Sequence, residues 1–356
     1  MKIGILTWYY GANYGAKAQA YALNQVVSHL GHTVQMVNYK TNGFEKVNIG
    51  TNLNVERAKH HPVLYLKCLW RVKNFWEVNK YFNESIVIRK GEDVDSLGLD
   101  CVIFGSDAIF NVNHKLFEKI YMGVGIKKTK KVSYAPSCED LNPNYKLSKE
   151  CIDSLRQFSN VSVRDENTKR LLKNNVGIDA VEVLDPTLLY DFVDISTRWD
   201  EKDYILIYTF SDWSIYQKQI QLFAKDHGLK IIAVGRYCKW AYRSYTAASF
   251  EQWICSFRKA TYVLTDSFHG TVFSIKNNKQ MILCSRPDKR AKIESLLNDA
   301  RIQRKFYDGK ESIETYLQAV TIDYQEVNQS MKKLVDFSMA YLQKSLADNV
   351  DYYGEH

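Results

Sequence analysis

Short apolar runs alternate with stretches of helical periodicity along most of the chain. The first run, residues 2–7, is followed by a loop, a helical stretch over about 16–30 and a second run at 33–39, and Gly31 ends the helix. A strand, a helix and a strand in this order predict a βαβ unit, in which the two strands are parallel. Further strands of this first series are predicted over 101–105, 131–135, 161–164 and 181–184.

A second series of the same kind starts at Tyr204, after a polar stretch over 191–203 that we expect to be a linker. Its elements are predicted as strands over 204–210, 230–234 and 262–265, helices up to about 227 and over about 250–258, and a long last helix around 324–348. Two such series predict a two-lobed α/β protein. In proteins of this kind the ligand usually binds in the crevice at the carboxyl ends of the strands.

The composition narrows the class of protein. A chain of 356 residues with 46% hydrophobic and 25% charged residues is typical of a globular protein with two domains. The apolar runs have the length of strands, well short of the roughly 18 residues of a membrane-spanning helix. The first residues, MKIGILTWYYG, do not have the pattern of a signal peptide. We therefore expect a cytoplasmic protein.

Charge and cysteine content bear on the kinds of site. The formal net charge of +8 suits anionic ligands or a membrane surface, but no basic stripe with interleaved aromatic residues predicts a nucleic-acid partner. The seven cysteines contain no CxxC pair, which argues against a disulfide framework and a zinc site. His60 and His61 have no ligand residue four positions further along, so no metal is predicted.

Polar residues stand at the carboxyl ends of several predicted strands. Gly11, Asn13 and Gly15 lie in the loop before the first helix and could hold an anion with backbone N–H groups, or form a tight turn with ordinary helix capping. The loop lacks the GxGxxG spacing of a dinucleotide site. Gly105-Ser106-Asp107 directly follows an apolar strand, which places Asp107 at the edge of the sheet, facing the predicted crevice.

Two further junctions add a cation and a histidine. Arg164 ends one strand, where it can hold a carboxylate or phosphate with two parallel hydrogen bonds, or pair with a neighbouring acidic side chain. His269 follows the strand at 262–265, in the stretch TDSFHGTVFS. Its place beside a helix N-terminus makes it a candidate acid or base, and the structural alternative is a helix cap with a histidine nearby.

The order and wording of these junctions resemble the polysaccharide pyruvyl transferase family. The stretches that carry the resemblance span about residues 2–300 and are KIGILTWYYGANYGAKAQAYAL, VIFGSDAIFN, VSYAPS, VSVRDENTKRLL, VLDPTLLYD and YVLTDSFHGTVFS. The resemblance implies a GT-B-like fold, with two Rossmann-type lobes facing a cleft. It also implies an activity, the transfer of pyruvate from phosphoenolpyruvate to two hydroxyls of a sugar to give a cyclic ketal.

On this resemblance, roles can be assigned at the cleft. His269 and Asp107 are the expected acid–base pair, because an imidazolium can protonate C3 of the donor or steady the departing phosphate, and a carboxylate can take up a hydroxyl proton. The residues assigned to the donor are Arg164, Ser267, Gly270, Thr271, Arg290 and Lys292. Those assigned to the acceptor are Asn13, Tyr14, Ser106 and Tyr134. No metal and no cofactor besides the donor substrate are expected.

The chain departs from the family pattern at several positions. Ser267 stands where some members have an arginine that serves the anionic groups of the donor, so another cation must replace it, and the candidates are Arg164, Arg286, Arg290 and Lys292. Ala108 and Phe110 stand in place of a glutamine and a tryptophan, and Pro136 departs as well. These changes leave the fold untouched and leave the donor contacts and the acceptor open.

A basic and aromatic insertion over about 55–90 interrupts the first lobe. Residues with helical spacing on one face of it are Tyr65, Leu69, Val72 and Trp76, with basic residues beside them. One interpretation is a helical hairpin over 59–82 that packs on the lobe or on a second subunit. The other is an interfacial helix at anionic lipid, which would suit a lipid-linked acceptor.

These predictions combine into one organisation. The expected parts are an acceptor-side lobe, a second Rossmann-like lobe and a C-terminal helix that returns to the first lobe, over 1–195, 196–315 and 316–356. The expected partners are phosphoenolpyruvate and a sugar or lipid-linked oligosaccharide, with contact to the inner face of the membrane and homo-oligomer formation left open. Two alternatives remain, a GT-B glycosyltransferase that uses a nucleotide sugar and a non-catalytic glycan-binding relative.

Overall fold

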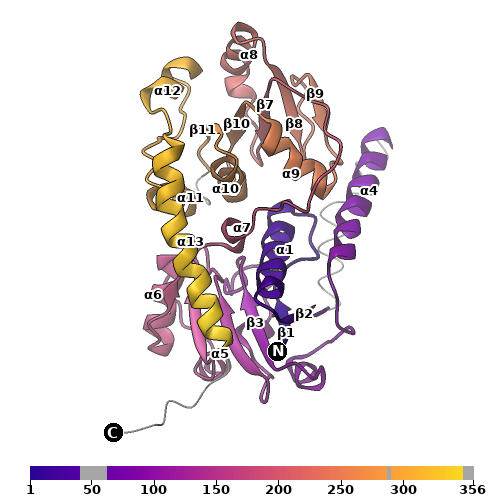
Figure 1. Cartoon of the computed structure of the whole chain (residues 1–356), viewed down its shortest axis with the longest axis vertical. Coiled ribbons are helices and arrows are strands. Elements are labelled where there is room, and N and C mark those ends of the chain that lie inside the picture. The colour runs from indigo at the N-terminus through magenta and orange to yellow at the C-terminus, as the bar shows by residue number, and fades with distance from the viewer. Residues whose placement is uncertain (41–61, 287–289, 348–356) are drawn as a thin grey trace.

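The chain folds into two α/β lobes stacked along the long axis of the molecule (Figure 1). The computed structural model describes residues 1–40, 62–286 and 290–347. Each lobe is built on its own parallel sheet, and no sheet of the described chain runs through both lobes. The two-lobed α/β fold predicted from the sequence is confirmed.

The first lobe contains a six-stranded sheet in the order β2-β1-β3-β4-β5-β6, with all neighbouring strands parallel. Its strands are β1 (Lys2–Leu6), β2 (Thr33–Met36), β3 (Cys101–Gly105), β4 (Lys130–Tyr134), β5 (Asn160–Val163) and β6 (Val181–Glu182). Its helices are α1 (Tyr14–His29), η2 (Gly91–Ser96), η3 (Lys119–Met122), α5 (Lys149–Leu155), α6 (Glu166–Val176) and α7 (Pro186–Leu189). Because parallel strands end at one edge, the loops after β1, β3 and β5 meet on the side of the second lobe.

The second lobe contains a five-stranded parallel sheet in the order β11-β10-β7-β8-β9. Its strands are β7 (Tyr204–Tyr208), β8 (Lys230–Val234), β9 (Arg243–Tyr245), β10 (Tyr262–Thr265) and β11 (Gln280–Leu283). Its helices are η4 (Ser214–Tyr216), α8 (Gln217–Asp226), α9 (Phe250–Lys259), α10 (Phe268–Lys276), α11 (Arg290–Asp299) and α12 (Ile313–Ala319). The sequence pattern did not predict β9 and β11, which are the two edge strands, with three and four residues.

The last helix, α13 (Tyr324–Leu346), leaves the second lobe and returns to the first, as the sequence predicted (Figure 1). Its Ser338 hydroxyl accepts a hydrogen bond from the backbone N–H of Leu184, at 3.0 Å. Just after the helix, the carbonyl of Ala347 accepts a hydrogen bond from the Lys130 ammonium, at 3.2 Å. The helix therefore connects the end of the second lobe to β4 and to the segment after β6.

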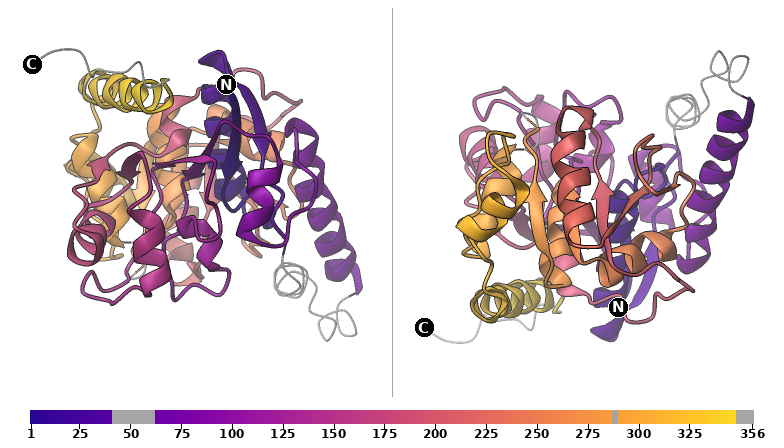
Figure 2. Two further views of the ribbon diagram at one scale, coloured as in Figure 1. Left: turned by 90° about the horizontal axis from the view of Figure 1, so that it is seen from below. Right: turned by 90° about the horizontal axis from the view of Figure 1, so that it is seen from above.

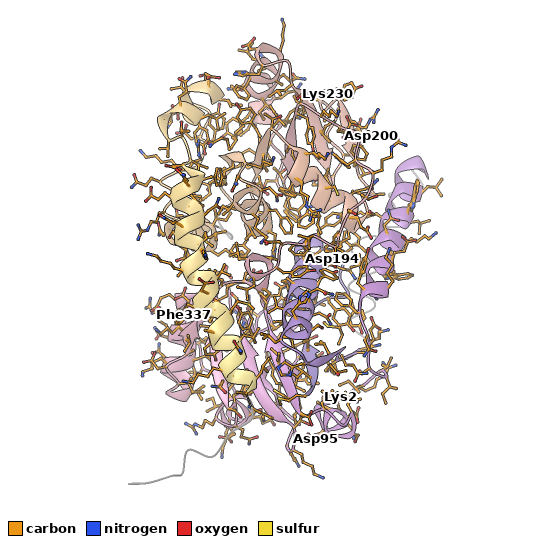
Figure 3. The ribbon with its side chains drawn as sticks, viewed as in Figure 1. Lys2, Asp95, Asp194, Asp200, Lys230 and Phe337 are labelled. Atoms are coloured by element: carbon orange, nitrogen blue, oxygen red, sulfur yellow. The ribbon has the colours of Figure 1, made fainter. Side chains whose placement is uncertain are left out.

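A shared apolar core holds the lobes together. Within the stretch predicted as a linker, Phe192, Ile195 and Trp199 are buried in a cluster that also includes residues of both sheets. Tyr21 and Tyr190 donate hydrogen bonds to Asp194, in the region where side chains fill the space between the lobes (Figure 3). The stretch looks like a linker because most of its residues are polar and exposed, but these three buried apolar side chains anchor it in the shared core.

Within the described part of the insertion, residues 62–90, the chain forms helix α4 (Pro62–Glu77) followed directly by η1 (Val78–Tyr81); the first residues of the hairpin expected over 59–82 lie outside the described residues. Residues 55–61 of the insertion, with His60 and His61, lie outside the described residues. Helix α4 stands at one margin of the molecule, beside both lobes (Figures 1 and 2). Asn74 donates to the carbonyl of Ala247 in the second lobe, at 2.6 Å. The insertion therefore bridges the two lobes.

None of the helices in the described ranges combines the length and the apolar character that crossing a membrane requires.

Candidate active site

A cavity of about 640 Å³ lies between the lobes, at the carboxyl ends of both sheets. The first lobe contributes the loops after β1, β3 and β5, and the second contributes the ends of β7 and β10 and the start of α11. The described residues that carry charge or a titratable side chain at its wall are Asp107, His114, Lys115, Glu139, Arg164, Tyr208, His269, Arg286 and Lys292. Cations outnumber carboxylates at this wall, which suits an anionic ligand.

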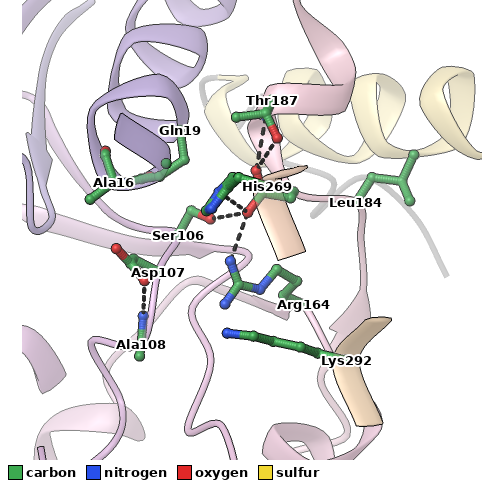
Figure 4. A network of polar contacts seen from close by, with 12 residues as sticks. Ala16, Gln19, Ser106, Asp107, Ala108, Arg164, Leu184, Thr187, His269 and Lys292 are labelled. Atoms are coloured by element: carbon green, nitrogen blue, oxygen red, sulfur yellow. Dashed lines mark hydrogen bonds and ion pairs between the residues drawn. The ribbon is translucent and has the colours of Figure 1, made fainter. Parts of the chain in front are cut away.

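The Asp185 carboxylate is buried beside Arg164 and His269, two residues that line this cavity. One oxygen accepts hydrogen bonds from the backbone N–H and hydroxyl of Thr187, at 3.0 and 2.6 Å, so Asp185 caps the short helix α7. The other accepts from the Ser106 hydroxyl at 3.1 Å and from Arg164 at 2.7 Å (Figure 4). Burial favours the neutral form, but His269, Arg164 and the hydrogen bonds outweigh it and lower the pKa of Asp185 to about 2.

Arg164 is anchored at one end of its guanidinium only. Nη1 is paired with buried Asp185, whereas Nη2 is buried and has no hydrogen-bond partner among the described residues. The guanidinium carbon lies 5.0 Å from the centre of the Phe268 ring, and the Lys292 ammonium lies 5.7 Å from the same ring. Figure 4 shows the second end of the guanidinium directed away from Asp185, on the side of Lys292. The geometry leaves this end able to bind an anion.

His269 reaches the first lobe from the start of α10. A Cβ atom on Gly15 would lie 2.1 Å from His269 Nδ1, so only a glycine at the start of α1 leaves room for the imidazole. Nε2 lies 3.9 Å from Asp185 Oδ2, is buried, and has no hydrogen-bond partner in the described chain. Burial lowers the pKa of His269 to about 4, although Asp185 and Asp107 act in the opposite direction. The imidazole is therefore neutral at pH 7 in the unliganded protein.

Asp107 stands in an unusual backbone conformation. Ser106 and Asp107 have φ angles of 41° and 66°, in the left-handed region that residues other than glycine seldom adopt. The carboxylate lines the cavity, and one of its oxygens accepts a hydrogen bond from the N–H of Ala108 at 2.8 Å. Strain of this kind is often found at functional sites, where the surrounding structure maintains it. The turn places the carboxylate in the same cavity as His269.

The other residues assigned to the donor have different places. Ser267 is the N-cap of α10 and accepts from Gly270 N at 3.0 Å, and Thr271 donates to the Ser267 carbonyl at 3.0 Å. Ser267 lines the cavity, whereas Gly270 and Thr271 are buried behind it. Of the cations proposed to replace the missing arginine, Arg164, Arg286 and Lys292 line the cavity. Arg290 does not; it pairs with Glu294 at 2.7 Å on the exposed side of α11.

The residues assigned to the acceptor are also divided. Asn13 lines the cavity and caps α1 through its side chain. Tyr14 lies next to it and donates to the Ala248 carbonyl of the second lobe at 2.6 Å. Ser106 is buried under the cavity, where it donates to Asp185. Tyr134 is buried and donates to the Leu184 carbonyl at 3.1 Å, so its hydroxyl is turned toward the interior and away from the cavity.

Sequence reasoning missed the role of Asp185. The stretch VLDPTLLYD was noted as part of the family resemblance, and Asp185-Pro186-Thr187 has the form of a helix start, with a capping residue before proline. That signal predicts a cap, and the structure adds that the second carboxylate oxygen binds Arg164. Within 1–40, 62–286 and 290–347, no group of three His, Cys, Asp or Glu side chains has the proximity that a metal ion requires.

Comparison with known proteins identifies the family. The sequence profile described as polysaccharide pyruvyl transferase matches residues 13–288 of the 356. The chain belongs to this family. No curated protein shows a significant sequence match. Membership makes the protein an enzyme, a pyruvyltransferase, and connects its activity with the pyruvylation of polysaccharide. The matched range includes Asp107, Arg164, Asp185 and His269.

Solved structures are similar to this chain in fold. A UDP-GlcNAc 2-epimerase from Neisseria meningitidis is similar over 98% of this chain and 95% of its own, with a TM-score of 0.50 and 10% identity. A protein from Listeria monocytogenes, described as a UDP-N-acetylglucosamine 2-epimerase, is similar over 98% of this chain and 91% of its own, with a TM-score of 0.52 and 8% identity. The glycosyltransferase SsfS6 from Streptomyces sp. SF2575 covers 96% of each chain, with a TM-score of 0.40 and 11% identity. The pyruvyltransferase has the GT-B-like fold that the resemblance implied.

The low pKa of His269 has a consequence for the stability of the pyruvyltransferase. A histidine in the unfolded chain titrates at about 6.5. Between that pH and about 4, the unfolded chain binds a proton that the folded protein does not, so the free energy of unfolding falls as the pH falls. We expect His269→Gln to remove this loss, worth about 2 kcal/mol between pH 7 and pH 5. Denaturant unfolding at both pH values measures it, and an identical pH dependence in both proteins would contradict a buried neutral imidazole.

Proposed function

We propose that the enzyme transfers the pyruvate of phosphoenolpyruvate to two hydroxyl groups of a sugar, forming a cyclic ketal and releasing phosphate. The observation that supports this most strongly is the composition of one cavity, where Arg164, Arg286 and Lys292 lie with His269 and Asp107. Phosphoenolpyruvate carries a carboxylate and a phosphate, and its reaction needs a proton donor and a proton acceptor. The cavity offers both kinds of group within a family whose members act on polysaccharide.

The donor would lie against the cations of the cavity. Arg164 is held by Asp185 at 2.7 Å, so its guanidinium is oriented before the donor binds. Arg286 and Lys292 come from the second lobe, which also contributes Ser267. They therefore reach the donor from the same side as the position where some family members have an arginine. This arrangement can replace that arginine with two cations from neighbouring segments.

The chemistry requires three proton transfers that balance. A proton is added to C3 of phosphoenolpyruvate, which turns the methylene into a methyl group and makes C2 electrophilic. The first sugar oxygen bonds to C2 and loses its proton, and the bond between C2 and the phosphate oxygen then breaks. The second sugar oxygen bonds to C2, and its proton leaves with the phosphate. We assign the proton on C3 to His269 and the acceptance of a hydroxyl proton to Asp107.

This assignment requires His269 to gain a proton when the donor binds. Burial keeps the imidazole neutral in the unliganded protein, with a pKa of about 4. An anionic donor in the same cavity acts in the opposite direction, because nearby negative charge favours the imidazolium. The cost of charging the histidine is then compensated by the carboxylate and phosphate of the donor. Binding and proton uptake are coupled in this mechanism.

The acceptor is proposed to be a lipid-linked sugar, which places the enzyme at the membrane surface. On α4, the exposed side chains Leu66, Leu69, Trp70 and Trp76 share one face, and exposed Lys73 lies among them. The opposite face packs Phe75 against Tyr14. An amphipathic helix with exposed tryptophans and a lysine has the composition of a segment that lies in a lipid interface. The positive net charge of +8 favours an anionic leaflet.

One assay separates this proposal from its two alternatives. The purified enzyme is given phosphoenolpyruvate with and without candidate glycolipids, and phosphate release is followed. A pyruvyltransferase releases phosphate only with an acceptor. A glycosyltransferase instead releases nucleoside diphosphate from a nucleotide sugar, and a non-catalytic glycan-binding protein releases neither.

Two cations on α11 provide a matched pair for donor binding. Lys292 lines the cavity and Arg290 does not. We expect Lys292→Gln to weaken phosphoenolpyruvate binding about 10-fold or more, the worth of one charge-assisted contact, and Arg290→Gln to leave it unchanged. Calorimetry measures both affinities. Equal affinities in the two variants would contradict the placement of the donor against Lys292.

The acid–base pair is tested by turnover together with proton uptake. We expect His269→Gln and Asp107→Asn each to reduce turnover about 100-fold or more while the unfolding transition is retained. Calorimetry in buffers of different ionisation enthalpy should detect a proton taken up with the donor by the wild-type enzyme, and not by His269→Gln. Full turnover of His269→Gln would show that this mechanism is wrong.

The membrane contact is tested with liposomes that contain anionic lipid, at low salt. We expect Trp76→Glu with Lys73→Glu to reduce binding strongly, because the double change removes an interfacial aromatic side chain and reverses a charge. Ile215→Glu with Lys218→Glu makes the same change of charge on an exposed surface of the second lobe and should bind as the wild type does. A wild-type enzyme that ignores these liposomes would rule out the contact.

A further inference from the structure

A second hollow, of about 300 Å³, opens beside the main cavity where α4 meets both lobes. The two hollows share the wall residues Ala12, Asn13, Tyr208 and Phe210. Arg71 of α4 and Arg236, which follows β8, line the second hollow and not the first. A ligand in the main cavity can therefore extend into this second space without crossing the protein interior.

The second hollow is cationic. It contains two arginines and, among the described residues that line it, no carboxylate. Arg71 is half-buried against the ring of Phe75, with the guanidinium carbon 5.5 Å from the ring centre. Its Nε is buried and has no hydrogen-bond partner in the part of the chain that the structure describes. A buried cationic donor without a partner is costly, and an anion that accepts its hydrogen bond removes the cost.

The opposite wall fixes the second arginine. Arg236 donates from Nη1 to the carbonyl oxygens of Phe210 and Ser211, the second at 3.1 Å. These contacts are with backbone carbonyl oxygens, so they orient the guanidinium without neutralising its charge, and the carboxylate that acts on it, Asp212, does not line this hollow. The start of α1 lies at the same wall through Asn13 and Tyr14, and a helix N-terminus adds partial positive charge. Three sources of positive potential from both lobes thus meet in one hollow.

Phe210 shows how a ligand would pass between the hollows. Its side chain is 47% exposed, although it is a large aromatic residue, and it lines both spaces. The Arg286 guanidinium lies over its ring, with its carbon 5.4 Å from the ring centre. Aromatic faces of this kind pack well against the apolar face of a sugar ring. A sugar resting on Phe210 would have its reacting hydroxyls on the side of Asp107 and its linkage on the side of Arg71.

We propose that the hollow between Arg71 and Arg236 binds a phosphate or diphosphate group attached to the acceptor sugar. This inference rests on the proposed function, because it takes the donor and the reacting hydroxyls to occupy the main cavity. The acceptor would then be an activated, phosphate-linked sugar and not a finished polysaccharide. A diphosphate of this kind occurs in both prenyl-linked and nucleotide-linked sugars, and the chemistry recognised by the arginines is common to the two.

The test uses inorganic pyrophosphate as the probe and calorimetry on the full chain. We expect Arg71→Gln and Arg236→Gln each to weaken pyrophosphate binding about 10-fold or more and to leave phosphoenolpyruvate binding unchanged, which also shows that the donor site is intact. Arg156→Gln, an exposed arginine outside both hollows, is the matched control and should bind both anions as the wild type does. Should Arg71→Gln fail to fold, Arg236→Gln alone carries the test.

Further ligands separate the two sources of the diphosphate. Uridine diphosphate represents the nucleotide-linked sugar and farnesyl diphosphate the prenyl-linked one. The ligand that binds more tightly than pyrophosphate identifies the class of acceptor, provided that Arg71→Gln removes this additional affinity. The proposal would be overturned if neither arginine affected the affinity for any of the three ligands. It would also be overturned if phosphoenolpyruvate displaced pyrophosphate, because the two would then share one site. A wild-type enzyme that binds pyrophosphate through Arg71 and does not bind phosphoenolpyruvate would instead refute the pyruvyl donor and keep the anion site.

Discussion

The ion pair between Asp185 and Arg164 is the interaction on which the site depends. Both side chains are almost completely buried, and a buried carboxylate is tolerated only when charge and hydrogen bonds compensate it. Asp185 receives that compensation from three segments, through Ser106 after β3, Arg164 after β5 and Thr187 in α7. Removing Arg164 would leave a buried, unpaired carboxylate. The loops that form the floor of the cavity are therefore fixed relative to one another by one charged group.

The Asp185 carboxylate also lies where the two lobes meet. His269 comes from the second lobe and lies 3.9 Å from Asp185, in space that exists because Gly15 has no side chain. The shared core around Phe192 and the hydrogen bond from Tyr14 to Ala248 hold the lobes at this separation. The imidazole therefore meets the first lobe as part of a packed interface. Its neutral state follows from that packing, because burial is the largest influence on its pKa.

The sequence predicted most of the strands and the loops that line the cavity, because these depend on local periodicity and on the rule that parallel strands end at one edge. It could not predict which way single side chains face. Arg290 and Lys292 are two residues apart, so on a helix with 3.6 residues per turn they point to nearly opposite sides, and only the packing of α11 decides which reaches the cavity. Tyr134 was assigned to the acceptor from its motif, yet its hydroxyl binds the Leu184 carbonyl inside the core. The contact of Asp185 with Arg164 could not be predicted, because the two residues are 21 positions apart and only Thr187 is a local partner of the carboxylate.

Unpaired buried nitrogen atoms connect the donor site with the second hollow. Arg164 Nη2, His269 Nε2 and Arg71 Nε are all buried without a hydrogen-bond partner in the described chain, and each belongs to a residue at the wall of one of the two spaces. Most buried polar atoms in proteins are paired, so unpaired nitrogen atoms of charged or titratable side chains at the walls of these two spaces need an explanation. Anions that bind there would supply the missing partners. Burying these unpaired groups is unfavourable during folding, and an anion that accepts their hydrogen bonds would remove that cost. The donors are already oriented, so they need no reorganisation when the ligand binds.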